Sequence, residues 1–168
     1  ATMKLPSFPP ELDYDVFDTS QVIPRLFISR MPALDDHDTQ RRKQQFIQVT
    51  LPLILKANDE ILDDKQTIAL AIRSGNDDVL AAFAKKYRLP ETQESAEQRD
   101  RSLQIRVQPI PVDIALAQAA VESGWGQSRF TREGNALFGQ WVWDISEGIK
   151  PAQASNSRAA VRSFPDLL

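Results

Sequence analysis

The sequence predicts a mainly α-helical fold with one short β element late in the chain. Apolar residues recur at helical spacing through much of residues 35–123, as in helices that bury one face. An aromatic stretch with strand-like alternation follows at residues 137–143. The chain has 168 residues, enough to bury a single core, so we expect one domain preceded by an extended arm.

Residues 1–34 are expected to form the extended N-terminal arm. Prolines and aspartates separate single apolar residues through most of this stretch, and proline disfavours helix both at its own position and at the residue before it. The segment 25–30 can form one short strand. We expect the arm to lie on the surface of the domain formed by residues 35–168, held there by Phe8, Tyr14 and Phe17.

A long helix is predicted after the arm, with Asp36 or Asp38 as its cap. Its apolar positions between residues 46 and 55 are too dense for one exposed stripe, so this helix should be largely buried. Pro52 predicts a kink within it. The helical pattern continues until a serine, a glycine and an asparagine interrupt it at residues 74–76.

Two further helices are predicted before the aromatic stretch, over residues 77–87 and 111–123, with a polar helix or loop between them. Residues 77–87 have the spacing of an amphipathic helix, with lysines near its C-terminal end. Residues 91–101 form a polar helix or loop. Pro111 then suits the first position of a central, alanine-rich helix over residues 111–123.

The composition excludes several classes of function. The net charge is -3, so no large basic surface attracts nucleic acid. The absence of cysteine removes disulfides and thiolate chemistry, and the single histidine, His37, argues against a histidine-rich metal site and a serine-histidine-carboxylate triad. We therefore expect no metal, no organic cofactor, no nucleic-acid partner and no membrane insertion, and the oligomeric state stays open.

Glu122 is the carboxylate that stands out in the central helix. Small alanines let neighbouring helices approach this segment closely, and Ile114, Val121 and Trp125 lie beside the glutamate on the helix surface. We expect Glu122 to be half embedded in apolar surroundings, where a carboxyl group keeps its proton as a glycosidase acid must. Taken alone, a solvated glutamate at a helix end is the commoner case.

Glycines and aromatic residues follow Glu122 at once. Gly124 and Gly126 are expected to end the helix. Trp125 can be a stacking platform for a sugar or a plug in the core, and the core role is the more common. In the aromatic strand, Gly139 indicates close approach by a ligand or by another backbone.

Two adjacent runs carry a family resemblance. ALAQAAVESGWGQSRF, followed by GNALFGQWVW, resembles the bacterial glucosaminidase family of peptidoglycan hydrolases, in particular its Bax-like branch, and RLFISRMP and FIQVTLPLILKANDEI resemble the preamble of that branch. The resemblance implies a lysozyme-like helical domain with a small β-hairpin lobe after the catalytic helix. It also implies an endo-β-N-acetylglucosaminidase that cleaves the β-1,4 bond after N-acetylglucosamine.

The same resemblance assigns roles to residues of this chain. Glu122 would be the general acid. Substrate-binding residues beside it would be Ser123, Gly124, Trp125, Gly134, Asn135, Phe138, Gly139, Gln140 and Trp141. Gln140 stands where many relatives carry an aliphatic residue. Relatives usually continue beyond the positions of Ser163 and Phe164, so we expect the domain to be incomplete at its C-terminal end.

A second carboxylate completes the usual mechanism of a glycosidase. It lies about 6.5–9.5 Å from the acid in inverting enzymes and about 5–5.5 Å away in retaining ones. Glu147 is the preferred candidate, and the others are Glu133, Asp144 and Asp166. Alternatively, the 2-acetamido group of the substrate acts as the nucleophile, so that no second protein carboxylate is needed.

Other functions stay open from the sequence. A lytic transglycosylase would act on the same polymer, and a non-catalytic module would bind a glycan or another partner. A helix-turn-helix DNA-binding protein would use Ser128, Arg129 and Arg132 on its second helix, but the acidic chain and the aromatic strand argue against it. The resemblance implies peptidoglycan glycan strands as the partner and a location in the bacterial periplasm or at the cell surface.

Overall fold

The computed structural model describes residues 7, 15, 18, 20, 22–23, 28–90, 95–152 and 159–168. Much of the predicted arm lies outside these residues, including Phe8, Tyr14 and Phe17 and the first half of the predicted strand. Within the described part, Ser7 forms an isolated parallel bridge with Ala33. The described residues 28–30 are not in a strand.

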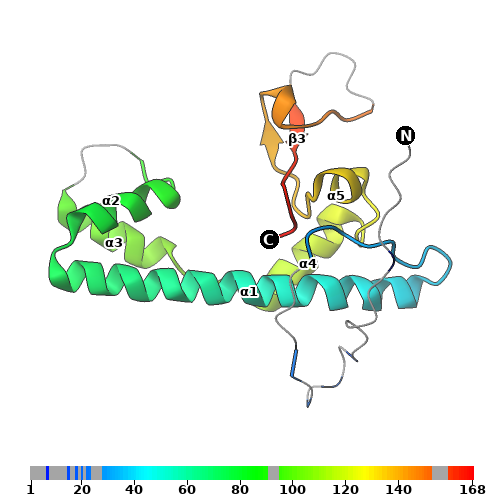
Figure 1. The fold of residues 1–168 in the computed structure, drawn as a ribbon, viewed down its shortest axis with the longest axis horizontal. Coiled ribbons are helices and arrows are strands. Elements are labelled where there is room, and N and C mark those ends of the chain that lie inside the picture. The colour runs from blue at the N-terminus through cyan, green and yellow to red at the C-terminus, as the bar shows by residue number, and fades with distance from the viewer. Residues whose placement is uncertain are drawn as a thin grey trace. The chain divides into compact units, whose positions relative to one another are not determined.

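Among the described residues, five α-helices and a small sheet make up the fold (Figure 1). Helix α1 spans Thr39–Ser74, and its start confirms the predicted cap because the N–H groups of Gln40 and Arg41 donate to Asp38 Oδ1 at 2.8 and 3.1 Å. The helix contains Pro52. It ends before Gly75, whose φ of 64° lies in the left-handed region.

The chain divides into two compact units, each held together by contacts among its own residues. The first contains Ala1–Leu55 and Pro111–Leu168, and the second contains Lys56–Ile110. The predicted separation into an arm and one domain from residue 35 stays a prediction.

The second unit contains α2 (Asp77–Lys86) and α3 (Ala96–Arg106). Both helices begin at side-chain caps: Asn76 accepts from the Val79 N–H, and Ser95 forms a capping box with Gln98. The core of this unit consists of Ile68, Ala71, Leu80, Leu103 and Val107.

A polar cluster joins α1 to the end of α2 within the second unit. Asp64 Oδ2 accepts hydrogen bonds from Lys86 Nζ at 2.5 Å and from the Tyr87 hydroxyl at 2.6 Å. Burial alone raises the pKa of Asp64, but these hydrogen bonds outweigh it and hold the pKa below its usual value. Burial, and then the hydrogen bond to Asp64, raise the pKa of Tyr87 well above its usual value.

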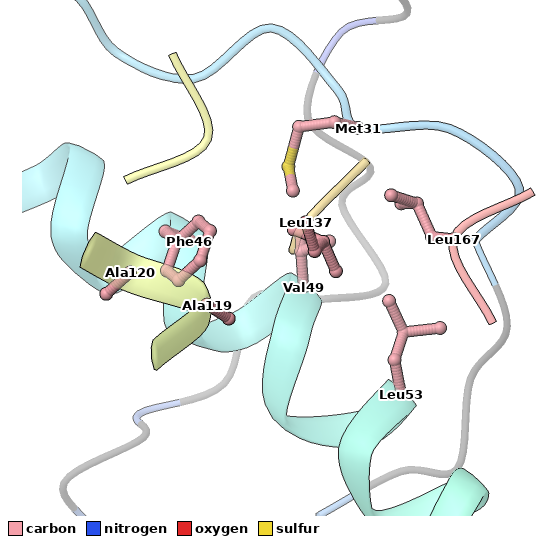
Figure 2. Packing of buried hydrophobic residues seen from close by; sticks show 8 residues of the cluster. All are labelled: Met31, Phe46, Val49, Leu53, Ala119, Ala120, Leu137 and Leu167. Atoms are coloured by element: carbon pink, nitrogen blue, oxygen red, sulfur yellow. The ribbon is translucent and has the colours of Figure 1, made fainter. Parts of the chain in front are cut away.

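The first unit contains α4 (Val112–Ser123), α5 (Arg129–Gly134) and the sheet. Figure 2 shows its core, in which α4 contributes Ala119 and Ala120 beside Phe46 and Val49 of α1. The small alanine side chains let the two helices lie close together. Met31, Leu53, Leu137 and Leu167 complete this core.

In the part of the chain that the structure describes, three short strands form the β lobe. They are β1 (Trp141–Val142), β2 (Gly148–Ile149) and β3 (Ala160–Arg162), and a 3-10 helix, η2 (Ile145–Glu147), precedes β2. The sheet is antiparallel with β3 in the middle, so it has one strand more than the predicted hairpin. The predicted mainly α fold with a small β lobe after α4 is confirmed. Among the described residues, no helix is long and apolar enough to cross a membrane.

Candidate active site

Helix α4 ends in three successive residues with left-handed backbone. The φ angles of Gly124, Trp125 and Gly126 are 58°, 58° and 78°. The Gly124 N–H reaches back to the carbonyl groups of Ala120 and Val121, which satisfies acceptors that a helix end otherwise leaves free. The chain therefore reverses sharply within two residues of Glu122.

Ser123 braces this turn from inside the protein. Its side chain is fully buried. Its hydroxyl donates to the Ala119 carbonyl at 2.5 Å and accepts from the Gly126 N–H at 2.9 Å. Both hydrogen bonds are internal, so the hydroxyl stabilises the turn and is not presented to a ligand on the surface.

Trp125 lies against the core of the first unit. Its half-buried ring packs edge-to-face on Phe46 with a centroid separation of 5.7 Å, and Lys43 Nζ lies 4.9 Å from the ring centroid. A left-handed residue other than glycine costs about 1–2 kcal/mol, and these contacts oppose that cost. The core role considered for Trp125 is the one that these contacts support.

Glu122 itself is exposed, so the expected half-embedded position is wrong. The reason is the orientation of α4: its small residues Ala119 and Ala120 face the core, whereas Val121 is 81% exposed. Among the described residues, no hydrogen bond or ion pair engages the Glu122 carboxylate. The acid is therefore accessible from solvent at the end of a packed helix.

Gly139 lies directly beside this carboxylate. A Cβ atom added at residue 139 would stand 3.3 Å from Glu122 Oε2, so the neighbour of this glycine is a side chain, whereas the sequence predicted a ligand or another backbone. The aromatic side chains on either side in the sequence are exposed, Phe138 by 45% and Trp141 by 59%. The structure thus brings Glu122 together with the backbone of the predicted aromatic strand.

Hydrogen bonds fix the backbone at this point. The Gln140 carbonyl accepts from the Arg162 N–H at 2.8 Å, and the Gln140 N–H donates to the Phe138 carbonyl at 2.9 Å. Trp141 pairs with Val161 in the sheet. The segment that passes Glu122 is therefore tied to the central strand β3.

Gly134 and Asn135 hold another part of the lobe. The Phe164 N–H donates to the Gly134 carbonyl at 2.9 Å, and Asn135 Nδ2 donates to the Phe164 carbonyl at 3.0 Å. Asn135 has a left-handed φ of 53° and is buried. A Cβ atom at residue 134 would lie 2.9 Å from Ile149 Cδ1 and from Ser163 Oγ. Both residues pack inside the lobe.

The candidate second carboxylates have partners of their own. Glu147 lies at the end of η2, with Oε2 3.7 Å from Arg162 Nη2. Asp144 caps η2, and hydrogen bonds from the hydroxyl and then the N–H of Ser146 lower its pKa. Glu133 lies 3.6 Å from Arg129 in an exposed ion pair. Glu147 is thus in contact with Arg162, a residue of β3.

Sequence reasoning missed Lys43 and Arg162. Lys43 precedes Phe46 by three residues on α1, so both side chains share a helix face; this spacing was the available signal. Arg162 is placed by the pairing of β3, which is too short to show a strand period. Among the described residues, no three histidine, aspartate or glutamate side chains are placed to hold a metal ion together.

Comparisons with known proteins found one family model and a similar protein. Residues 101–167 match the model of the glucosaminidase family, described as mannosyl-glycoprotein endo-beta-N-acetylglucosaminidase. The chain is also similar to Protein bax of Escherichia coli (strain K12), with 29% identity over 103 residues that cover 58% of this chain and 38% of that protein. No solved structure matches the chain. The resemblance of this chain to the glucosaminidase family, and to its Bax-like branch, is therefore confirmed, and residues 101–167, which match the family model, contain α4, Glu122 and the β lobe.

Proposed function

We propose that this chain is a peptidoglycan hydrolase, an endo-β-N-acetylglucosaminidase that cleaves the β-1,4 bond after N-acetylglucosamine with Glu122 as the general acid. One observation carries the proposal: an accessible carboxylate without a protein partner among the described residues stands beside Gly139, inside the segment that matches the family. A general acid must reach the glycosidic oxygen of the substrate and give it a proton.

Exposed apolar residues next to Glu122 and Gly139 in the sequence suit a sugar chain. Val121, Phe138 and Trp141 expose large apolar side chains, and aromatic rings offer flat apolar faces together with a polar handle in tryptophan. A glycan lying over this surface would remove water from the carboxyl group.

The second step has two routes within this proposal. Glu147 can serve as the base or nucleophile if the β lobe places it opposite Glu122 across the bound sugar. Alternatively, the 2-acetamido group attacks the anomeric carbon from within the substrate. A Glu147→Gln variant separates them: a loss of turnover comparable to that of Glu122→Gln supports the first route, and nearly normal turnover supports the second.

The test of the proposal is Glu122→Gln on purified peptidoglycan. We expect release of new reducing ends to fall by about a hundredfold or more, as for loss of general acid catalysis, while thermal unfolding hardly changes because the side chain is exposed. Glu60→Gln is a matched control, since Glu60 is also an exposed helical glutamate, paired with Lys56. Activity of Glu122→Gln equal to that of the control would reject the assignment.

Two related functions are distinguished by the products. A lytic transglycosylase would release anhydro-sugars, which mass spectrometry detects. A non-catalytic module would bind the glycan and leave it intact. DNA binding has little support, because the helix that would read DNA, α5, has six residues and Arg129 is engaged with the Lys150 carbonyl and Glu133.

The location follows from the substrate in this proposal. Peptidoglycan lies outside the inner membrane of bacteria, so we expect the protein in the periplasm or at the cell surface. Fractionation of producing cells with antibody detection tests this, and recovery in the cytoplasmic fraction alone would contradict it.

A further inference from the structure

Gly139 differs from the other tightly placed glycines of the lobe in what it touches. A Cβ atom at residue 148 would lie 2.2 Å from the Val161 carbonyl oxygen, and one at residue 134 would meet Ile149 and Ser163 at 2.9 Å. Val161, Ile149 and Ser163 have no role in the proposed reaction. At residue 139, the neighbour is Oε2 of Glu122 at 3.3 Å, the reactive end of the proposed acid.

The backbone conformation does not explain the glycine at position 139. The φ angles of Gly124 and Gly126 are left-handed, which favours glycine for conformational reasons. The φ of Gly139 lies outside the left-handed region, so alanine can adopt the same backbone. Glycine at position 139 instead leaves space for the Glu122 carboxylate.

The backbone at Gly139 is also held in place. Gln140 is bonded to Arg162 of β3, and Trp141 is paired with Val161. The backbone that carries a methyl group at residue 139 is therefore held in place by Gln140 and Trp141. The group that the methyl would approach is the exposed Glu122 side chain. The exposed Glu122 side chain would move, since rotating it costs little and breaks no hydrogen bond or ion pair among the described residues.

We propose that Gly139 is a positioning residue for the Glu122 carboxylate: the missing side chain at position 139 leaves the space beside Oε2 open, so that the carboxyl group can take the direction seen in the structure, from which an added methyl group would displace it. The inference rests on the proposed role of Glu122 as general acid. It assigns to Gly139 a function that acts through Glu122 and requires no contact with the sugar.

The first experiment introduces the methyl group. In Gly139→Ala, we expect kcat on purified peptidoglycan to fall by about tenfold to a hundredfold, since small displacements of a catalytic group have effects of this size. KM and the midpoint of thermal unfolding should stay close to the wild-type values. Gly75→Ala in the second unit is the control: its φ is 64° with no atom near the added methyl group, so it loses some stability but keeps its activity.

A double-mutant cycle then separates positioning from a general effect on the lobe. If Gly139 acts through Glu122, the alanine has no further effect on the residual rate in the Glu122→Gln background. Equal fractional losses in both backgrounds would overturn the inference, as would wild-type kcat in Gly139→Ala. A fall in its unfolding midpoint larger than that of Gly75→Ala would also overturn it, because the methyl group would then strain the fold.

The two proposals fail in different ways. Full activity of Glu122→Gln would remove the proposed function, whatever Gly139→Ala does. An inactive Glu122→Gln together with a fully active Gly139→Ala would leave the function standing and remove the positioning role of Gly139.

Discussion

Lys43 Nζ lies 4.9 Å from the centroid of the Trp125 ring. Trp125 belongs to the turn that follows α4. The ammonium group interacts favourably with the negative face of the indole, and such contacts contribute about 0.5–1 kcal/mol at accessible sites. The pair joins the first half of α1 to the residue three positions after Glu122.

We expect Lys43→Met to lower the free energy of unfolding by about 0.5–1 kcal/mol, because methionine keeps much of the apolar stem and removes the charge. Urea titration measures this change. Lys56→Met is the control, since Lys56 forms an exposed ion pair with Glu60 and, among the described residues, no cation–π contact with an aromatic ring. Equal effects of the two substitutions would show that the indole contact contributes nothing.

Gly126 should tolerate alanine less well than Gly124. Both residues have left-handed φ angles, which cost alanine about 1–2 kcal/mol. At Gly126 the added methyl group also stands 3.0 Å from Leu34 Cδ1 and 3.2 Å from Phe46 Cδ2, whereas Gly124 has open space. Overpacking adds about 1–3 kcal/mol, so Gly126→Ala should show the lower urea midpoint. The reverse order would contradict the packing seen here.

Asn135 should resist substitution for two separable reasons. Asn135→Gly keeps the left-handed conformation and removes the hydrogen bond to the Phe164 carbonyl, so a loss of about 1 kcal/mol is expected. Asn135→Ala adds the cost of an alanine at φ 53°, about 1–2 kcal/mol more. Chemical unfolding of both variants tests the order. Equal stability of the two would mean that the backbone conformation relaxes.

The Asp64 cluster predicts how stability depends on pH. The pKa of Tyr87 is raised in the folded protein, so its contribution is complete below the unfolded value of about 10 and is lost as the pH rises further. The pKa of Asp64 is lowered, so its contribution is present above about pH 4 and is lost as the pH falls through the folded pKa.

Tyr87→Phe tests the alkaline side of this prediction. The variant should be less stable than the wild type at pH 8, and its free energy of unfolding should decline less between pH 10 and 11. Urea unfolding across this range, followed by circular dichroism, provides the measurement. Parallel curves for the two proteins would show that Tyr87 does not cause the decline.

The sequence predicted the long first helix, its cap at Asp38 and the helix after residue 76, because apolar spacing and capping residues act locally. It also placed Glu122 at a helix end beside glycines. It misjudged which side of α4 is buried, because Ile114 and Val121 are more apolar than the alanines opposite them. Close packing of α4 against α1 needs small side chains, so the alanines face inward and the larger residues face solvent.

The rest of the lobe could not be read from local pattern. Its strands have two or three residues, too few for a period, and their pairing joins segments distant in sequence. The resemblance assigned Ser123, Gly134 and Asn135 to the substrate, and in the structure they are buried and engaged in internal packing or hydrogen bonds. The roles of Gly134 and Asn135 depend on Phe164, which lies about 30 residues further along the chain.

The middle strand of the sheet is the last to be synthesised. Both β1 and β2 pair with β3. During synthesis, the segment beside Glu122 therefore has no strand to pair with until Arg162 has left the ribosome. The helices of the first unit depend less on such distant partners and can form earlier. The surface that faces the proposed glycan is thus completed late in synthesis, and activity should appear only after β3 has paired.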